Sequence, residues 1–251
     1  MCGRYASSRK PEDLIEEFEV VDSRIEEPLD ADYNVAPTKE VYAVVERRPS
    51  KDSEEPPQRQ LRTLRWGLVP SWAKDPAIGS RMINARMETV AEKPSFKRAF
   101  AARRCLLPAD GYFEWYPTSR TGKNGKPLKQ PFFIRPADGG ILAMAGLYEI
   151  WRDPTRDPDD PARFLWTCTV LTTQAEDAVG HIHDRMPLMV EPDRRAAWLD
   201  PEVSAKDDLL PLLVPAAPGQ LEAYPVATLV NNVRNNGPEL LEPLPLEESL
   251  A

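Results

Sequence analysis

Short segments with the composition of β-strands recur along this chain, and they constrain its fold more than any other feature. Each is rich in β-branched and aromatic residues and ends at proline, glycine or a charged loop. The predicted strands are residues 41–45, 61–68, 105–108, 111–115, 131–134, 141–145, 146–151 and 164–172. The predicted helices are short and cover residues 11–20, 87–90, 96–102 and 194–199. We therefore predict an α+β fold with a large, mostly antiparallel, barrel-like β-sheet flanked by short helices.

The chain of 251 residues is long enough to bury a substantial core, and it shows no internal repeat. Strand-like segments continue without a break in character, so we predict a single domain over residues 1–240, followed by a loosely held acidic tail at 241–251. Residues 47–59 and 153–161 combine charge with proline, which predicts irregular surface loops. Residues 118–129 are rich in Gly, Lys and Asn and predict a hairpin excursion.

The composition predicts a cytoplasmic protein. No run approaches the roughly 18 consecutive apolar residues of a membrane span, and the N-terminus lacks the apolar core of a signal peptide. The three cysteines, Cys2, Cys105 and Cys168, are odd in number and widely separated. This pattern is typical of a reducing compartment and does not suggest a disulfide framework.

The most reactive position is the second residue. If Met1 is removed, Cys2 carries an α-amine and a thiol on adjacent carbons, which makes it a 1,2-aminothiol. The amine has an ordinary pKa near 8, so part of it is neutral at physiological pH and can condense with an aldehyde. The thiol then closes on the imine in an intramolecular step and gives a thiazolidine. Position alone fits equally an ordinary cysteine in a disordered terminus.

The charge is unevenly distributed along the chain. The net charge of −8 argues against a nucleic-acid partner, since phosphate binding needs local positive potential. Residues 81–104, however, hold seven basic and two acidic residues, a local balance of +5. Residues 191–251 hold eleven acidic and four basic residues, a balance of −7. The basic stretch is either a solvated face or a local site for an anionic partner.

Glu114 lies in Gly-Tyr-Phe-Glu-Trp, a predicted strand in which bulky aromatic residues flank it. Burial among such side chains would raise the pKa of the carboxyl group, which could then carry a proton at neutral pH. The alternative is a glutamate on the solvent face of an alternating strand.

The two histidines, His181 and His183, both lie in residues 181–187. A His-X-His pair without a nearby cysteine or carboxylate of suitable spacing is a weak ligand set, so we expect no metal site and no cofactor. Asn84 and Arg86 are two residues apart and would point to the same side of an extended segment. They could hold a sugar or a phosphate, or cap a turn.

Six motifs occur in order along nearly the whole chain, from Cys2 to about Asn236. They are Met-Cys-Gly-Arg-Tyr, Asn-Val-Ala-Pro-Thr, Trp-Gly-Leu-Val-Pro-Ser-Trp, Ile-Asn-Ala-Arg-Met-Glu-Thr, Gly-Tyr-Phe-Glu-Trp and Ile-His-Asp-Arg-Met-Pro. Together they resemble the SRAP (SOS response-associated peptidase) family. The resemblance implies the SRAP fold and a sensor of abasic sites in single-stranded DNA, which shields the lesion as a covalent thiazolidine crosslink in the DNA damage response.

The resemblance also implies catalytic roles. Cys2 would be the nucleophile and Glu114 the acid/base for Schiff-base formation and ring closure or reversal. His183 would help to open the sugar ring, and Asn84 would position the sugar. The family is also thought to remove its own Met1, and an abasic-site lyase side activity is conceivable.

The remaining implied residues would bind DNA. Arg4, Arg86 and Arg185 would neutralise phosphates, and Trp72 would stack on bases. Asn34 and Pro37, in the second motif, complete the expected DNA-binding set. We expect a monomer with single-stranded DNA containing abasic sites as its partner, no membrane contact, and association with the nucleoid if the source is bacterial.

Three other functions remain open at this point. N-terminal-nucleophile amidotransferases also begin with Met-Cys-Gly, but they continue with Ile where this chain has Arg4, and no Gly-Asn-Gly-type glutamine pocket is present. A non-catalytic reader of single-stranded DNA would bind with strong salt dependence and leave no covalent adduct. A dedicated protease would need a partner that activates Cys2 as a thiolate.

Overall fold

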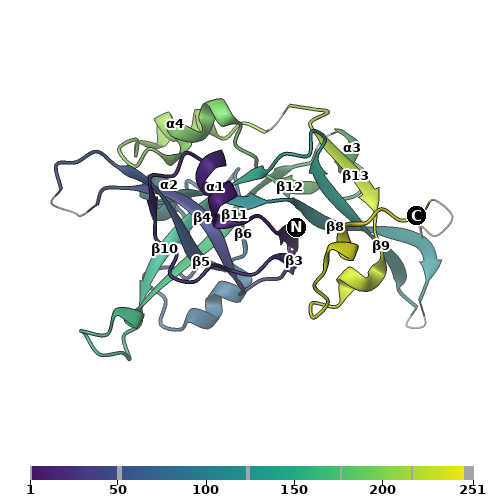
Figure 1. The fold of residues 1–251 in the computed structure, drawn as a ribbon, viewed down its shortest axis with the longest axis horizontal. Helices are drawn as coiled ribbons and strands as arrows, with labels where there is room; N and C mark the ends of the chain where they lie inside the picture. The colour runs from purple at the N-terminus through teal and green to yellow at the C-terminus, as the bar shows by residue number, and fades with distance from the viewer. Residues whose placement is uncertain (1, 50–52, 123–124, 176, 216, 246–251) are drawn as a thin grey trace.

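The centre of the protein is a closed ring of five strands (Figure 1). The computed structural model describes residues 2–49, 53–122, 125–175, 177–215 and 217–245. The ring contains β4 (Glu40–Arg47), β5 (Gln58–Trp66), β7 (Arg104–Ala109), β10 (Leu142–Arg152) and β11 (Phe164–Gln174). Its pairings are antiparallel except that of β5 with β11, which is parallel and closes the ring. The predicted barrel is therefore confirmed, and the two strands predicted over residues 141–151 are one.

Three short strands pair with strands of the ring. They are β2 (Asp22–Ser23), which pairs with β5, and β6 (Asn84–Arg86) and β12 (Arg185–Pro187), which pair with β11. A second sheet has the order β13 (Leu221–Pro225), β9 (Pro127–Pro136), β8 (Gly111–Thr121), β1 (Tyr5–Ser7) and β3 (Asp32–Val35). Side chains of this sheet, including Tyr5, Tyr112 and Ile134, join the core inside the ring. The N-terminus is therefore built into the centre of the fold.

The helices are short and pack outside the ring. They are α1 (Pro11–Glu17), α2 (Lys97–Ala102), α3 (Asp177–Gly180), α4 (Arg195–Leu199) and α5 (Lys206–Leu209). Short 3-10 segments cover Pro76–Arg81, Pro161–Arg163, Pro192–Arg194, Leu210–Leu212, Thr228–Asn231 and Pro238–Leu241. Leu14, Phe100 and Trp198 on these helices pack against the outward side chains of the ring.

The helix predicted at residues 87–90 is wrong. The Met87 N–H still bonds to the Thr172 carbonyl at 3.0 Å, so this segment begins as a continuation of the extended chain. Hydrogen-bonded turns then follow, in which Thr89 bonds to Arg86 and Glu92 to Thr89. Pro94 lies too close for a helix to continue, because the residue before a proline is biased away from helical conformation.

The interior of the ring is narrow and tightly filled. Gly146 on β10 shows the limit, since a Cβ atom there would lie 2.8 Å from the Cys105 Sγ and 3.0 Å from a Leu107 methyl carbon. Cys168, Trp66 and their neighbours complete a continuous apolar filling. The ring is a packed core with two mouths and has no open channel between them.

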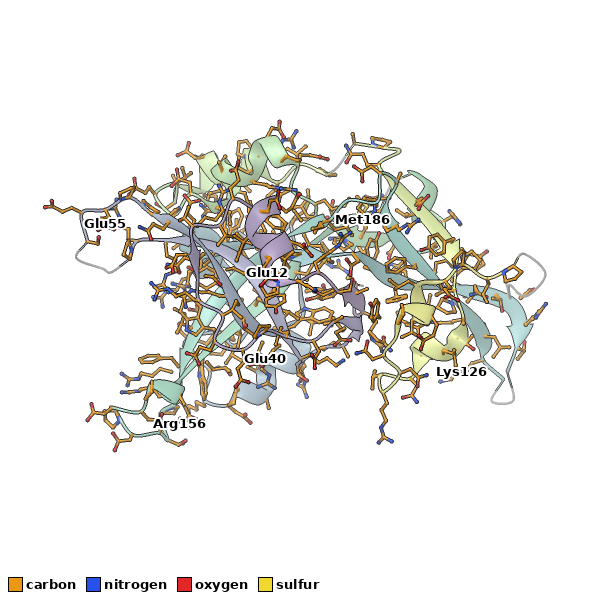
Figure 2. All side chains as sticks on the ribbon, in the orientation of Figure 1. Glu12, Glu40, Glu55, Lys126, Arg156 and Met186 are labelled. Atoms are coloured by element: carbon orange, nitrogen blue, oxygen red, sulfur yellow. The ribbon has the colours of Figure 1, made fainter. Side chains whose placement is uncertain are left out.

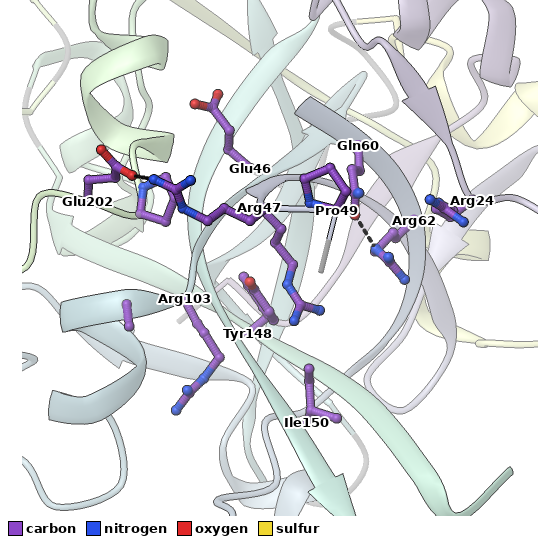
Figure 3. Close-up of a pocket in the computed structure, with 13 residues that line it drawn as sticks. Arg24, Glu46, Arg47, Pro49, Gln60, Arg62, Arg103, Tyr148, Ile150 and Glu202 are labelled. Carbon is purple, nitrogen blue, oxygen red and sulfur yellow. Dashed lines mark hydrogen bonds and ion pairs between the residues drawn. The ribbon is translucent and has the colours of Figure 1, made fainter. Parts of the chain in front are cut away.

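The two mouths differ in chemistry. At one mouth, the N-terminal segment and β6 meet the C-terminal half of β11. At the other, the apolar filling gives way to Arg47, Arg62 and Tyr148, which line an open pocket (Figure 3). Every strand of the ring runs from one mouth to the other, so the two surfaces are separated by the core.

Three excursions project from the body and carry charged side chains, among them Glu55, Lys126 and Arg156 (Figure 2). Their described parts agree with the loops predicted over residues 47–59 and 153–161 and with the hairpin predicted over residues 118–129, while residues 50–52 and 123–124 lie outside the described residues. The predicted loose tail at 241–251 falls mainly on residues 246–251, which lie outside the described residues. Before that point, the Leu244 N–H donates to the Pro225 carbonyl at 2.8 Å.

Candidate active site

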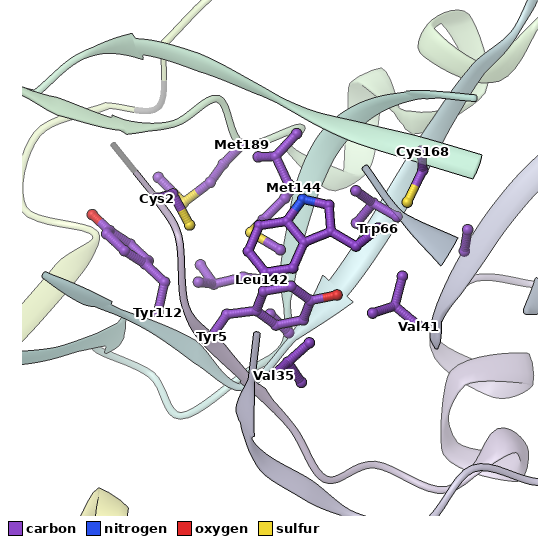
Figure 4. Close-up of a cluster of buried hydrophobic side chains, with 14 of the residues drawn as sticks. Cys2, Tyr5, Val35, Val41, Trp66, Tyr112, Leu142, Met144, Cys168 and Met189 are labelled. Carbon is purple, nitrogen blue, oxygen red and sulfur yellow. The ribbon is translucent and has the colours of Figure 1, made fainter. Parts of the chain in front are cut away.

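Cys2 is fully buried at the first mouth of the ring, close to Tyr112 and Met189 (Figure 4). Burial raises the pKa of its thiol well above the ordinary value, and the charge of Glu114 raises it further. A hydrogen bond from the Arg4 backbone opposes this shift only in part. The thiol is therefore protonated at neutral pH, and a nearby base must take its proton when it reacts.

Asn84 connects β6 to the N-terminal segment. Its Nδ2 donates to the Cys2 carbonyl at 2.7 Å, and its backbone lies opposite Val170 in the parallel pairing of β6 with β11. Trp66 fixes the same segment, because its Nε1 donates to the Ile83 carbonyl at 2.9 Å. The Asn84 Oδ1 is buried and has no hydrogen-bond partner among the described residues, so an acceptor remains available beside Cys2.

Glu114 lies on β8 opposite Phe132 of β9 and is only 4% exposed. Burial raises the pKa of its carboxyl group, and the charge of His183 opposes that shift. The predicted desolvated carboxyl is confirmed, and the alternative of a solvent-facing glutamate is wrong. Because Glu114 also acts on the pKa of Cys2, the structure brings these three side chains within electrostatic range of one another.

His183 follows α3 and is partly exposed, at 29% for its side chain. Its Nδ1 accepts the backbone N–H of Arg185 at 2.9 Å, and the Asp184 carboxylate lies 3.1 Å from the same nitrogen. The Arg185 carbonyl lies 3.2 Å from the same nitrogen. These contacts hold the imidazole in place between α3 and β12.

Tyr112 belongs to this site although the sequence analysis did not select it. It lies two residues before Glu114 and opposite Tyr5 in the pairing of β8 with β1. Its hydroxyl is buried and finds no hydrogen-bond partner within the described chain. Burial raises its pKa, and the charges of Cys2 and Glu114 raise it further, so the phenol stays neutral. The two-residue spacing from Glu114 was the available signal, since it places both on one face of a strand.

Arg4 and Asn34 have structural partners. Asn34 is fully buried, and its Nδ2 donates to the carbonyls of Val230, Asn232 and Asn235 at 3.3, 3.0 and 2.9 Å. The Arg4 Nη1 donates to the Asn34 Oδ1 at 2.7 Å and to the Val230 carbonyl at 2.8 Å. Asn34, predicted as a DNA contact, has a structural role here: its amide holds the 230–235 segment beneath the N-terminal segment.

The expected phosphate-binding arginines differ in availability. Arg86 is exposed on β6, with its backbone opposite Thr172. Arg185 is 12% exposed, and its guanidinium bonds to both carboxylate oxygens of Glu88, at 2.6 and 3.0 Å. Arg185 also donates to the Thr172 carbonyl at 2.6 Å. Arg86 and Arg185 thus flank the same end of β11, but Arg185 is neutralised by Glu88.

The other expected contacts lie apart from these groups. Trp72 is 57% exposed on the segment between β5 and β6, and it makes no ring contact within the part of the chain that the structure describes. Its neighbour Ala73 accepts a hydrogen bond from the Trp151 Nε1 at 2.7 Å. Pro37 is half-buried in the turn before β4, where the Thr38 N–H donates to the Trp66 carbonyl at 2.8 Å.

The basic stretch 81–104 is not a uniform surface. Arg104 is 2% exposed, and its guanidinium donates to five backbone carbonyls that tie α2 and α4 to the ring. Arg103 pairs with Glu149 at 2.8 Å. These two charges serve the fold, and the local positive balance overstated what is available to a ligand.

The described residues contain no group of three His, Cys, Asp or Glu side chains placed to hold a metal ion. They also contain no helix long and apolar enough to span a membrane.

The chain is similar to known proteins of one family. The family model described as SOS response associated peptidase (SRAP) matches residues 1–233. The abasic site processing protein YoqW of Bacillus subtilis is 38% identical over 243 residues, which cover 96% of this chain and 99% of that protein. YedK of Escherichia coli, with the same descriptive name, is 34% identical over 97% of this chain and 100% of its own length. HMCES of Xenopus tropicalis, also named an abasic site processing protein, is 30% identical over 96% of this chain and 78% of that protein.

Solved structures show the same fold. A crystal structure of a protein from Bacteroides thetaiotaomicron has a TM-score of 0.75 at 24% identity and covers 97% of this chain and all of that one. A second, from Bordetella bronchiseptica, has a TM-score of 0.66 at 25% identity and covers 90% of this chain and all of that one.

The partners of Asn34 predict a large effect of its removal. In Asn34→Ala, three buried or partly buried carbonyls and Arg4 lose a shared partner, so we expect the free energy of unfolding to fall by about 2–4 kcal/mol. Asn236→Ala is the matched control, because Asn236 is exposed and makes two comparable side-chain bonds at 2.8 and 3.1 Å. Urea denaturation measures both. Equal losses in the two variants would show that burial of the Asn34 amide is not the source of its effect.

Proposed function

We propose, from the premise that this chain belongs to the SOS response-associated peptidase (SRAP) family, that it processes abasic sites in single-stranded DNA by covalent capture through Cys2. The proposal rests chiefly on one observation: Cys2 is fully buried, its carbonyl accepts from the Asn84 Nδ2 at 2.7 Å, and the charge of Glu114 is near enough to raise the pKa of its thiol. An incidental cysteine in a loose terminus would be neither buried nor held. The proposal includes removal of Met1, which the protein itself would carry out, and a lyase side activity.

The capture would proceed in two steps. The Cys2 amine adds to the open-chain aldehyde of the abasic sugar, and loss of water gives an imine. The thiol then adds to the imine carbon, its proton passes to nitrogen, and a thiazolidine ring closes. A free imine would hydrolyse or promote strand cleavage by β-elimination. Ring closure removes the iminium that drives elimination, so the thiol determines whether the product is stable.

Glu114 would move both protons. Its raised pKa favours the protonated form, which can donate to the departing hydroxyl in the first step. The resulting carboxylate can then accept the thiol proton, which the buried Cys2 retains at neutral pH. One carboxyl group thus serves as acid and then as base.

Asn84, His183 and Tyr112 would act on the sugar. The closed-ring form of an abasic sugar must open before it offers an aldehyde, and that opening moves a proton between oxygens. The oriented imidazole of His183 can assist it, while the buried Oδ1 of Asn84 can accept from a sugar hydroxyl. The neutral Tyr112 hydroxyl supplies a donor on the same side as Glu114.

DNA would approach over the same mouth. Arg86 offers an exposed guanidinium to a phosphate, and Arg185 would do so after exchanging Glu88 for the phosphate. Arg4 would contribute positive potential from its bonded position, and exposed Trp72 would stack on a base further along the strand. Pro37 would shape the turn on the same path.

The first prediction concerns the nucleophile. Cys2→Ala should abolish the heat-stable adduct with uracil-excised single-stranded DNA, because no other aminothiol is available. Cys168→Ala is the control, since Cys168 is also buried but lies inside the ring. Denaturing gels and intact-mass analysis measure the adduct together with the presence or absence of Met1. A normal adduct in Cys2→Ala would exclude this mechanism and leave a different nucleophile or a non-catalytic reader.

The second prediction concerns pH. The rate of adduct formation should be low at acidic pH, where the Cys2 amine is protonated, and should fall at alkaline pH, where Glu114 has lost the proton that it donates even though burial raises its pKa. Glu114→Gln should remove the falling limb and lower the maximal rate about 100-fold, with little change in non-covalent binding. Glu222→Gln, an exposed change on β13, should keep the wild-type profile. An unchanged profile in Glu114→Gln would remove Glu114 from its role.

The third prediction concerns the Arg185–Glu88 pair. Glu88→Gln should release the guanidinium and increase the affinity for undamaged single-stranded DNA about three-fold, as expected when a single, partly exposed ion pair competes with a phosphate. Glu92→Gln is the control, because it makes the same charge change at a 73% exposed side chain on a neighbouring turn. Fluorescence anisotropy at low salt measures both. If the two variants gain equally, net charge and not the release of Arg185 controls affinity.

A further inference from the structure

The second mouth of the ring holds a basic pocket that the capture of abasic sites does not use. Its volume is about 750 Å³, within the range of small-molecule sites. We propose that this pocket binds a phosphate group, with Arg47 and Arg62 as the residues that hold the anion. Arg47, Arg62 and Tyr148 all line the pocket, and Figure 3 shows Tyr148 beside Arg47.

The position of these arginines is unusual for a barrel. Arg47 continues the inward face of β4 that begins with Val41, Ala43 and Val45. Arg62 lies opposite Ala43 on β5 and therefore faces inward as well. Inward positions of a small barrel are ordinarily filled by apolar side chains. Apolar packing therefore does not explain why two guanidinium groups lie at the end of this core.

The other charges around the pocket are already paired. Arg24 bonds to Asp22, Arg48 to Glu202 and Arg103 to Glu149. Glu46, the remaining acid of the lining, pairs with Arg59 at 3.4 Å. Within the described residues, neither Arg47 nor Arg62 has a carboxylate at ion-pair distance. The pocket therefore holds two uncompensated positive charges.

Neighbouring side chains hold both groups in place. The guanidinium carbons of Arg47 and Arg62 lie 4.9 and 4.3 Å from the centre of the Trp166 ring. Trp166 is itself stacked on Tyr148, with 5.7 Å between ring centres and 10° between planes. The Arg62 Nε donates to the Gln60 Oε1 at 2.9 Å. The aromatic pair thus supports both cations, and most of their N–H donors remain available to an anion.

The two cations also act on each other. Burial lowers the pKa of Arg62, and the charges of Arg47 and Arg24 lower it further. A bound phosphate would relieve this repulsion and match the planar donors of two arginines. The same chemistry could come from a free mononucleotide or from the phosphodiester backbone of a DNA strand.

The pocket is distinct from the Cys2 site. Trp166 and Thr172 mark the two ends along β11, and six residues of strand span roughly 20 Å. The packed ring lies between them. Binding at one mouth can therefore be measured without disturbing chemistry at the other.

The test compares the full chain with Arg47→Gln/Arg62→Gln. The probes are deoxyadenosine 5′-monophosphate, deoxyadenosine without phosphate, and a lesion-free single-stranded oligonucleotide. Arg98→Gln/Arg120→Gln is the control, with the same loss of charge at exposed positions outside the pocket. Calorimetry at low salt should show binding of the monophosphate but not the nucleoside, weakened at least ten-fold only in the pocket variant. If the phosphate comes from DNA, the oligonucleotide affinity and its salt slope should fall instead, the slope by about 1–2.

One result would contradict the proposal. If both phosphate-bearing probes bind the pocket variant as tightly as they bind the control, the two arginines serve only to pack on Trp166 and the proposal is wrong. If the double variant does not fold, the same test is repeated with Arg47→Gln alone, a change at the last residue of β4. Adduct yield at Cys2 should stay unchanged in every variant, so failure of this proposal is distinguishable from failure of the proposed capture.

Discussion

The parallel pairing of β5 with β11 is the contact on which the rest of the structure depends. Arg65 opposite Thr167 and Trp66 opposite Cys168 convert a curved sheet into a closed ring. Closure leaves the central strands without a free edge there and fixes the width of the interior, where Gly146 has no room for a side chain. Trp66 then supports Ile83, so the same contact positions Asn84 beside Cys2.

Burial shifts the pKa values of this site and makes its thiol less reactive when no substrate is bound. It raises the pKa of Cys2 and that of Glu114 together, so the thiol keeps its proton at neutral pH and the carboxyl group is shifted toward its protonated form. An exposed thiolate would react with oxidants and other electrophiles. In the proposed capture, a neutral thiol near a carboxyl group would react when an imine forms within reach, which would link its activation to the first step.

Much of the fold could be predicted from sequence, because alternation and turn residues report local structure. The aromatic neighbours of Glu114 also predicted its desolvation correctly. Asn34 bonds to partners about 200 positions away along the chain, and such distant partners leave no local signal in the sequence. Its motif therefore suggested a surface contact, whereas the structure has a buried amide that holds a distant segment. The same holds for the bond between Arg185 and Glu88. Composition likewise counted Arg104 as available charge, since it cannot distinguish a buried guanidinium from an exposed one.

The bond from Arg4 to the Val230 carbonyl spans 226 positions. At a translation rate of about 5–20 residues per second, a ribosome needs roughly 10–45 s to make the intervening chain. During that time the N-terminal segment lacks this anchor. The architecture therefore delays enclosure of the N-terminal segment until the stretch that contains Val230 has left the ribosome.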